Sequence, residues 1–153
     1  MTGKTLIAYA SKSGANSEAA NTIADALKTT YNMDITIADL RKEKPDITPF
    51  QNIIVGSGVR AGRVYSEAVN FLGNNFGERK VALYFCCGEG GDPKTHDKCI
   101  SEDTGKALAK NSSLKPIAVE AFGGRMKMLG KVLWDSRDQS KVREWAIALG
   151  KQL

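Results

Sequence analysis

LIAYASKSGANSEAA, residues 6–20, joins a short apolar run to an alanine-rich helical pattern through a turn of small hydroxyl and amide residues. The first amides of a helix have no partner within the helix, and they lie at the positive end of its dipole. An anion such as a phosphate monoester can therefore bind at this kind of turn. We expect the turn to hold a phosphate, and an ordinary helix cap is the simpler alternative.

The composition is that of a globular protein, with 153 residues, of which 42% are hydrophobic and 25% are charged. This length suits a single domain covering residues 1–153, and the chain has no internal repeat or linker. No apolar run approaches the ~20 residues of a membrane span, and the first residues do not resemble a signal peptide. Three cysteines are too few for a disulfide framework. We therefore expect a cytoplasmic protein.

The formal net charge of +5 favours acidic partners, anionic ligands or an anionic membrane surface. The basic residues are scattered, with mild clusters at residues 41–44 and 125–131. None of these clusters is interleaved with aromatic residues in the way that a nucleic-acid module requires. The sequence therefore predicts no nucleic-acid partner.

Apolar runs rich in β-branched residues alternate with helical patterns along the chain. Most of the runs are continuous, which is typical of strands buried on both faces of a parallel sheet. This alternation predicts a three-layer, doubly wound α/β fold with a five-stranded parallel sheet in the order 2-1-3-4-5. Residues 39–51 contain two prolines and are expected to form a loop or a short turn. The predicted strands are residues 5–10, 35–38, 53–56, 81–86 and 117–122.

In this topology ligands bind beyond the carboxyl ends of the strands, near the switch between the first and third strands. Three segments follow those ends, at residues 11–17, 57–64 and 87–96. The first offers short hydrogen-bonding side chains. The second has three glycines that allow a flat ligand to approach the backbone closely. The third is glycine-rich and polar, and its backbone could bond the edge of a heterocycle.

Together these loops resemble those of the flavodoxin family. The family motif is an aromatic residue, any residue, Ser or Thr, two residues, Gly, any residue and Thr. Here residues 9–16 read YASKSGAN, in which Asn16 replaces the threonine, and Ala20 follows in the helix. Residues 53–66 are similar to the flavodoxin-domain branch that includes menaquinone-dependent protoporphyrinogen oxidases. The strand order 2-1-3-4-5 is the flavodoxin-like order.

The resemblance implies one non-covalently bound FMN, with its phosphate in the first loop and its ring between the second and third loops. The phosphate residues would be Ser11, Lys12, Ser13, Gly14, Ala15 and Asn16, and the ring residues Gly58, Val59, Arg60, Ala61, Gly62, Cys86, Cys87, Gly88, Glu89, Gly90 and Asp92.

The expected ring site has few aromatic residues. Arg60 stands where a tryptophan often stacks on the ring in the family, the third loop offers only His96, and Tyr65 is expected in the core. By the resemblance, the reduced flavin is an anion. Basic side chains near the ring should therefore make this flavin less reducing than that of an acidic flavodoxin. The candidates are Lys12, Arg60, Arg63, Lys94 and His96.

Three functions stay open at this point. The first is an FMN electron carrier, in which no side chain need act as acid or base. The second is an FMN-dependent oxidoreductase of the protoporphyrinogen or quinone type, and the third is a flavin-free interaction module. The expected partners are redox proteins, acidic and ferredoxin-like, or a quinone.

Two further features bear on the site. Cys86, Cys87, His96 and Cys99 lack the spacing of a zinc site, so no metal is expected. Both adjacent cysteines are expected to be structural, with a ligand-facing, redox-sensitive Cys87 as the alternative. Residues 123–137 mix basic and apolar side chains. We expect this segment to pack over the core or the fifth strand, and an interfacial helix that touches a membrane or a partner is the alternative.

Overall fold

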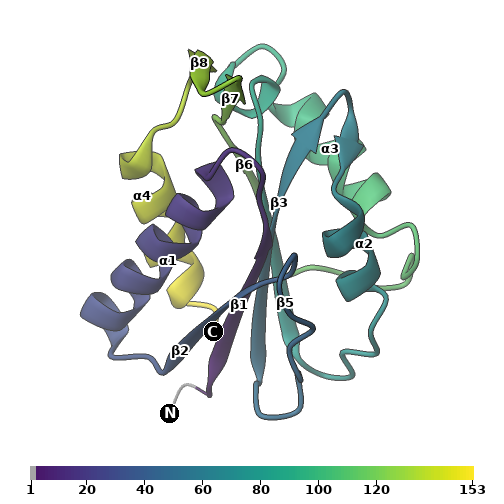
Figure 1. The fold of residues 1–153 in the computed structure, drawn as a ribbon. Coiled ribbons are helices and arrows are strands. Elements are labelled where there is room, and N and C mark those ends of the chain that lie inside the picture. Colours follow the sequence, from purple (N-terminus) through teal and green to yellow (C-terminus); the bar gives the residue numbers. More distant parts are fainter. Residues whose placement is uncertain (1–2) are drawn as a thin grey trace.

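The computed structural model describes residues 3–153 as a parallel sheet covered by helices on both faces (Figure 1). The strands of this sheet are β1 (Thr5–Ala10), β2 (Ile35–Asp39), β3 (Asn52–Arg60), β4 (Arg63–Val64), β5 (Lys80–Cys86) and β6 (Ala118–Phe122). The helices are α1 (Ala15–Tyr31), α2 (Ser66–Leu72), η1 (Glu89–Gly91), α3 (His96–Ala107) and α4 (Gln139–Gly150). A separate hairpin consists of β7 (Arg125–Met128) and β8 (Lys131–Asp135).

The long strands have the order β2-β1-β3-β5-β6 and are all parallel. This order confirms the predicted 2-1-3-4-5 arrangement, because the two-residue β4 only pairs with the end of β3. Helices α1 and α4 cover one face of the sheet, and α2 and α3 cover the other (Figure 1). The carboxyl ends of β1, β3 and β5 therefore meet at one edge, which is where the hairpin lies.

Successive residues of each strand enter opposite layers of the core. Leu6 and Ala8 pack on the side of α2 and α3, and Ile7 packs on the side of α1 and α4. Burial on both faces explains why the apolar runs are continuous. Each fully buried large apolar side chain contributes about 1.5–3 kcal/mol to the free energy of unfolding. Packing is so close at Gly56 that a Cβ atom there would lie 2.0 Å from the ring of Tyr84.

The third strand runs further than predicted. It continues beyond residue 56 to Arg60, and the chain then turns at Ala61 and Gly62 into β4. Both turn residues have positive φ, at 52° and 74°. The Tyr65 N–H donates to the Ser57 hydroxyl at 3.2 Å, which ties the start of α2 back to the strand. Residues 57–64 are therefore a strand and a tight turn and not an open loop. Residues 40–51 form no helix or strand, as expected.

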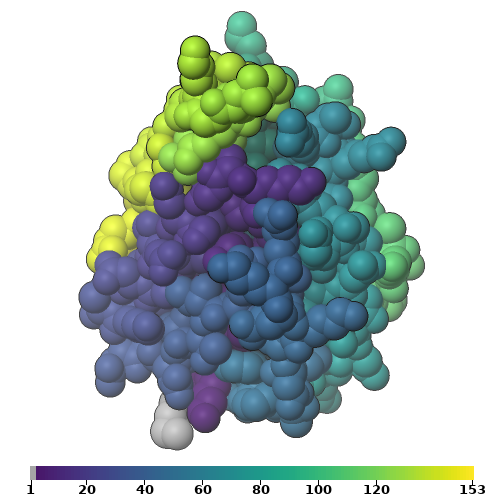
Figure 2. Space-filling model, viewed as in Figure 1, coloured from purple at the N-terminus to yellow at the C-terminus, as the bar shows by residue number. Residues whose placement is uncertain are grey.

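Residues 123–137 do not pack over the core as expected, and they form strands in place of the helix of the alternative. They form a hairpin whose turn, Leu129-Gly130, has positive φ at both positions, 51° and 78°. Its outer apolar side chains do not pack over the core, since Leu129 is 97% exposed. In β7 the basic and apolar residues alternate with a period of two, which is the pattern of a strand and not of a helix. Figure 2 shows the hairpin projecting beside the loop that follows β1.

Within residues 3–153, none of the helices combines the length and the apolar character that crossing a bilayer requires.

Candidate functional site

The loop after β1 turns sharply into α1. Gly14 has φ of 87°, and its N–H donates to the Ser11 hydroxyl at 3.1 Å. The first helical hydrogen bond runs from the Glu18 N–H to the Gly14 carbonyl at 3.0 Å. The amides of residues 15–17 therefore lie ahead of this bond, at the positive end of the helix dipole. This geometry is the one that the sequence predicted for an anion.

Asn16 is the most informative residue of this turn. It is 2% exposed, and its backbone carbonyl accepts a hydrogen bond from the Tyr84 hydroxyl at 3.1 Å. Its side-chain Oδ1 is buried and has no hydrogen-bond partner among residues 3–153. A buried polar atom without a partner calls for a ligand or a water molecule. The carboxamide can offer either an acceptor or a donor, because its two ends exchange when the group flips.

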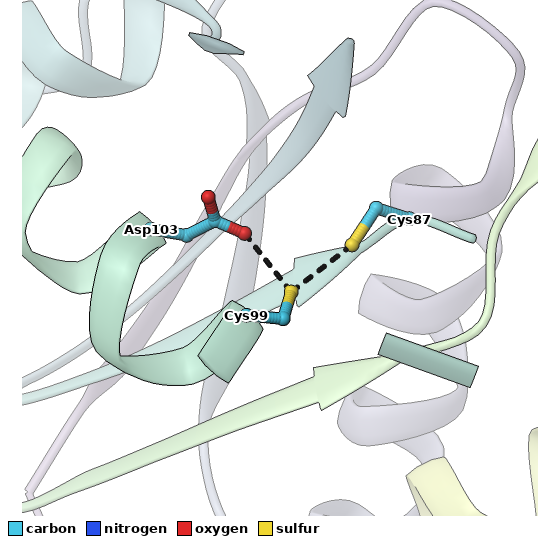
Figure 3. A group of neighbouring side chains, drawn as sticks. All are labelled: Cys87, Cys99 and Asp103. Carbon is cyan, nitrogen blue, oxygen red and sulfur yellow. Dashed lines mark hydrogen bonds between the residues drawn. The ribbon is translucent and has the colours of Figure 1, made fainter. Parts of the chain in front are cut away.

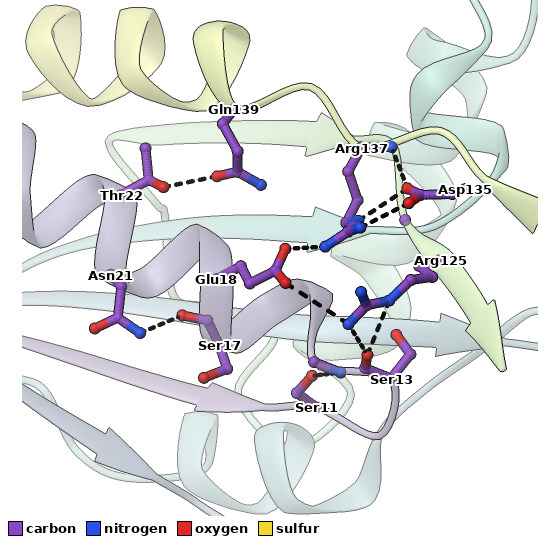
Figure 4. A network of polar contacts seen from close by, with 12 residues as sticks. Ser11, Ser13, Ser17, Glu18, Asn21, Thr22, Arg125, Asp135, Arg137 and Gln139 are labelled. Atoms are coloured by element: carbon purple, nitrogen blue, oxygen red, sulfur yellow. Dashed lines mark hydrogen bonds and ion pairs between the residues drawn. The ribbon is translucent and has the colours of Figure 1, made fainter. Parts of the chain in front are cut away.

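A guanidinium from the hairpin reaches this loop (Figure 4). The Nε and Nη2 atoms of Arg125 donate to the Ser13 carbonyl at 3.2 and 2.5 Å. Nη2 also lies 3.7 Å from the Glu18 carboxylate, which pairs with Arg137 as well. Arg137 in turn bonds Asp135, and this bond lowers the pKa of that carboxyl group. The network ties both ends of the hairpin to the first turn of α1.

A pocket of about 90 Å³ lies where the loop after β1, the end of β3, the end of β5 and the hairpin converge. Eight predicted residues line it: Lys12, Ser13, Asn16, Gly58, Val59, Arg60, Cys86 and Cys87. Five residues that the sequence analysis did not assign to the site complete the lining: Tyr65, Arg125, Met126, Lys127 and Trp134. Four of the lining residues are basic, and no described Asp or Glu lines the pocket. The site is therefore electropositive.

Two aromatic side chains border the pocket. Tyr65 lies against Gly58, where a Cβ atom would be 2.7 Å from the tyrosine ring, and the Lys12 ammonium lies 4.8 Å from the centre of that ring. Tyr65 also packs against the core as predicted, and burial raises its pKa. The second aromatic residue is Trp134 from β8, which lies beside Gly88 of the third loop. The only sequence signal for Trp134 was its place in the mixed basic and apolar segment 123–137.

The other predicted residues lie outside the pocket lining. Ser11, Gly14 and Ala15 shape the first turn, and Ala61 and Gly62 form the β3–β4 turn. The third-loop residues Gly88, Glu89, Gly90 and Asp92 form η1 and its two flanks.

The predicted basic residues Arg63, Lys94 and His96 are also absent from the lining. The His96 Nε2 atom instead lies 2.5 Å from the Glu120 carboxylate, in a separate groove of about 730 Å³ beside α4. Burial lowers the pKa of His96, but hydrogen bonds to Asp97 and Glu120 outweigh this and raise it above its usual value. His96 is therefore not brought together with the cysteines.

The three cysteines are all free and buried. Cys86 lies at the end of β5 as predicted, and burial raises the pKa of its thiol. Cys87 lines the pocket, and its Sγ atom lies 3.2 Å from Cys99 Sγ on α3. The sequence analysis did not anticipate this contact.

Fold and site together define an open, doubly wound α/β protein with an electropositive pocket at its topological switch point. Comparison with models of protein families identifies the family to which the chain belongs. Residues 6–135 match the model of the flavodoxin domain, so the chain belongs to the flavodoxin family. No curated protein sequence matches the chain.

Solved structures share the fold over nearly the whole chain. The oxidised flavodoxin 2 of Bacillus cereus superposes with a TM-score of 0.68 at 19% identity, covering 98% of this chain and 99% of that one. The oxidised flavodoxin 1 of the same organism has a TM-score of 0.65 at 18% identity, with the same coverage. A Fusobacterium nucleatum flavodoxin bound to flavin mononucleotide has a TM-score of 0.62 at 14% identity, covering 99% of both chains.

Proposed function

We propose that this chain is an FMN-binding electron-transfer protein. The loop after β1, with Ser13, Asn16 and the first amides of α1, holds the phosphate. The ring lies against the end of β3 at Gly58–Gly62 and the segment after β5 at Cys86–Asp92. Bound FMN supplies the electron-transfer chemistry, and the protein supplies binding and electrostatics.

One observation carries this proposal: an unpartnered buried amide oxygen, a helix start and four basic side chains meet at one pocket. A phosphate monoester matches the positive charge and the free amides. The family match and the FMN in the Fusobacterium nucleatum flavodoxin support the same cofactor.

The flavin ring can enter the site only if part of the protein moves. A pocket of about 90 Å³ has room for about three water molecules, and a three-ring heterocycle is much larger. The side chains that border the pocket from outside the sheet, Trp134 and Met126, come from the hairpin. We therefore include in the proposal that FMN binding displaces the hairpin, which polar contacts of Arg125 and Arg137 hold in place.

Lys12 and Arg60 act on the ring through charge. Both line the pocket without a carboxylate beside them in its lining. Positive charge stabilises a reduced, anionic ring, so these residues raise its potential above that of an acidic flavodoxin. A differential of about 1.4 kcal/mol corresponds to about 59 mV for one electron. The same charges favour an acidic, ferredoxin-like redox protein as the partner. The free cysteines agree with the reducing cytoplasm as the location.

The test is a titration of the flavin-stripped chain with FMN, in which the fluorescence of Trp134 is the readout. Trp145 packs in the core against Tyr84 and Phe122, so a Trp145→Phe variant isolates the Trp134 signal. Saturable binding of one FMN with a change in Trp134 emission is the expected result. A chain that neither carries flavin nor takes it up would contradict the proposal and identify a flavin-free interaction module.

The loaded protein then separates a carrier from an enzyme. A carrier passes electrons to and from a redox protein without turning over a small substrate. Catalytic turnover with a quinone or with protoporphyrinogen would instead assign the chain to the FMN-dependent oxidoreductases that residues 53–66 resemble.

A further inference from the structure

A thiol pair and a carboxyl group form a buried cluster beside the pocket (Figure 3). Cys87 follows the end of β5, and Cys99 and Asp103 lie one turn apart on α3. The two Sγ atoms are 3.2 Å apart, and Cys99 Sγ lies 3.0 Å from Asp103 Oδ2. The exposed fractions are 7% for Cys87, 2% for Cys99 and 5% for Asp103. Electron transfer through a bound flavin does not require any of these three groups.

The surroundings give the two thiols different roles. Cys87 lines the pocket, whereas Cys99 lies behind it. The hydrogen bond that Cys87 shares with Cys99 lowers the pKa of Cys87, as does a backbone hydrogen bond from Gly90, against the effect of burial. Hydrogen bonds to Cys87 and Asp103, together with burial, raise the pKa of Cys99. Cys87 is therefore the thiol that meets a small reagent as a thiolate, and Cys99 is the thiol that keeps its proton.

Asp103 is placed to take that proton. Burial raises the pKa of its carboxyl group, and the group touches the Cys99 sulfur directly. A carboxylate within hydrogen-bonding distance of a thiol can act as its general base.

We infer that Cys87 and Cys99 are a peroxide-reactive dithiol that closes reversibly to an intramolecular disulfide, with Asp103 as the proton acceptor. Cys87 is 7% exposed, and the pocket that it lines has about 90 Å³ of space, which admits a small oxidant such as hydrogen peroxide. The reaction needs no bound flavin, although Cys87 also borders the pocket in which the flavin ring is proposed to lie.

The reaction balances in two steps. Cys87 first loses its proton to solvent. Its thiolate attacks one oxygen of hydrogen peroxide, the O–O bond breaks, and the departing hydroxide takes up a proton from solvent to form water as Cys87 becomes a sulfenic acid. The Cys99 proton passes to Asp103, and the Cys99 thiolate attacks the Cys87 sulfur. The S–O bond then breaks, and the departing hydroxide takes up a proton to form water. Two thiols and one peroxide give one disulfide and two waters, and a dithiol reductant reverses the change by thiol–disulfide exchange.

The experiment uses the full chain stripped of flavin, so its outcome does not depend on whether the chain binds FMN. The reduced protein is exposed to a few equivalents of hydrogen peroxide, denatured in N-ethylmaleimide and mapped by peptide mass spectrometry. We expect a linked pair of peptides containing Cys87 and Cys99, with Cys86 alkylated, and loss of the link after dithiothreitol. Because this measurement is made on the unaltered chain, it does not depend on whether a variant folds.

Matched variants assign the roles, after circular dichroism has shown that each one folds. Cys86→Ala should keep the Cys87–Cys99 link. Cys99→Ser should stop at a Cys87 sulfenic acid that dimedone captures. Asp103→Asn should leave the first oxidation unchanged and slow disulfide closure about a hundredfold, the low end for a positioned general base.

Three results would overturn the inference. The first is full alkylation of all three thiols after peroxide. The second is a link that joins Cys86 in place of Cys87. The third is a chain that retains zinc, which protects Cys87 and Cys99 from alkylation until a chelator removes it, because the cluster would then hold a metal ion and not act as a dithiol.

Discussion

The loop after β1 and the β7–β8 hairpin meet at the same pocket, but they are held in place by different forces. The loop joins a largely buried strand to a helix whose first two residues are buried, and the Tyr84 hydroxyl donates to the Asn16 carbonyl from the core. The hairpin exposes its apolar side chains and is attached by the guanidinium groups of Arg125 and Arg137. The loop after β1 is therefore held by the buried core, whereas the hairpin is held by polar contacts at its two ends.

The largest effect should come from a change in the loop after β1. Gly14→Ala forces a side chain into the left-handed region at φ of 87° and places Cβ 2.8 Å from the Arg125 guanidinium. We expect it to lower the free energy of unfolding by about 1–2 kcal/mol, measured by urea denaturation. Gly105→Ala is the matched control, since it lies in α3 with open space around it. This control should stabilise the protein by about 0.5–1 kcal/mol, and equal effects of the two changes would contradict the account.

A change at the attachment of the hairpin should have a smaller global effect and a clear local one. Arg125→Ala removes the hydrogen bonds to the Ser13 carbonyl. We expect a loss of about 1 kcal/mol in unfolding free energy and faster hydrogen exchange of the β7 and β8 amides. Lys131→Ala, on the exposed strand β8, should change neither. Unchanged exchange in the arginine variant would mean that other contacts hold the hairpin.

Stability should also depend on pH through His96, which pairs with Glu120 in the separate groove beside α4. Its raised pKa means that the charged pair stabilises the fold fully below the unfolded value of 6.5, and that this contribution disappears as the pH rises through the higher folded value. Because both side chains are partly exposed, the contribution is at most about 1 kcal/mol. His96→Gln should therefore be less stable than the parent chain in acid and equal to it in weak alkali, by thermal unfolding. The same difference at both pH values would contradict the assignment.

The smallest effect should be at the tip of the hairpin. Leu129 is 97% exposed and has φ of 51°, which asparagine adopts more readily than leucine. Leu129→Asn should change the unfolding free energy by no more than about 0.5 kcal/mol, toward greater stability. Leu129→Val should destabilise the protein, because a β-branched residue is strained at positive φ. A clear loss of stability in the asparagine variant would show that the tip is packed in solution.

The loop after β1 and the hairpin also differ in how well the sequence predicts them. The strand order and Lys12, Ser13 and Asn16 were predictable because a buried strand, a turn and a helix start are set by neighbouring residues. Arg125 and Trp134 were not predictable, because they reach the pocket only through contacts with residues far away in the chain.

Other features were missed for related reasons. The extension of β3 depends on the pairing of Arg60 with Arg63, which turn geometry creates. The contact of Cys87 with Cys99 depends on how α3 packs against β5 and β6. Neither requirement leaves a periodic signal in the sequence.

The most direct test of the phosphate-binding loop compares FMN with riboflavin, which lacks the phosphate, on the parent chain and on a Ser13→Ala, Asn16→Ala double variant. The account predicts that the variant loses about tenfold or more in FMN affinity, about 1.4 kcal/mol, while its affinity for riboflavin stays the same. Undiminished FMN affinity, or an equal loss for both ligands, would contradict the assignment of the phosphate to this loop.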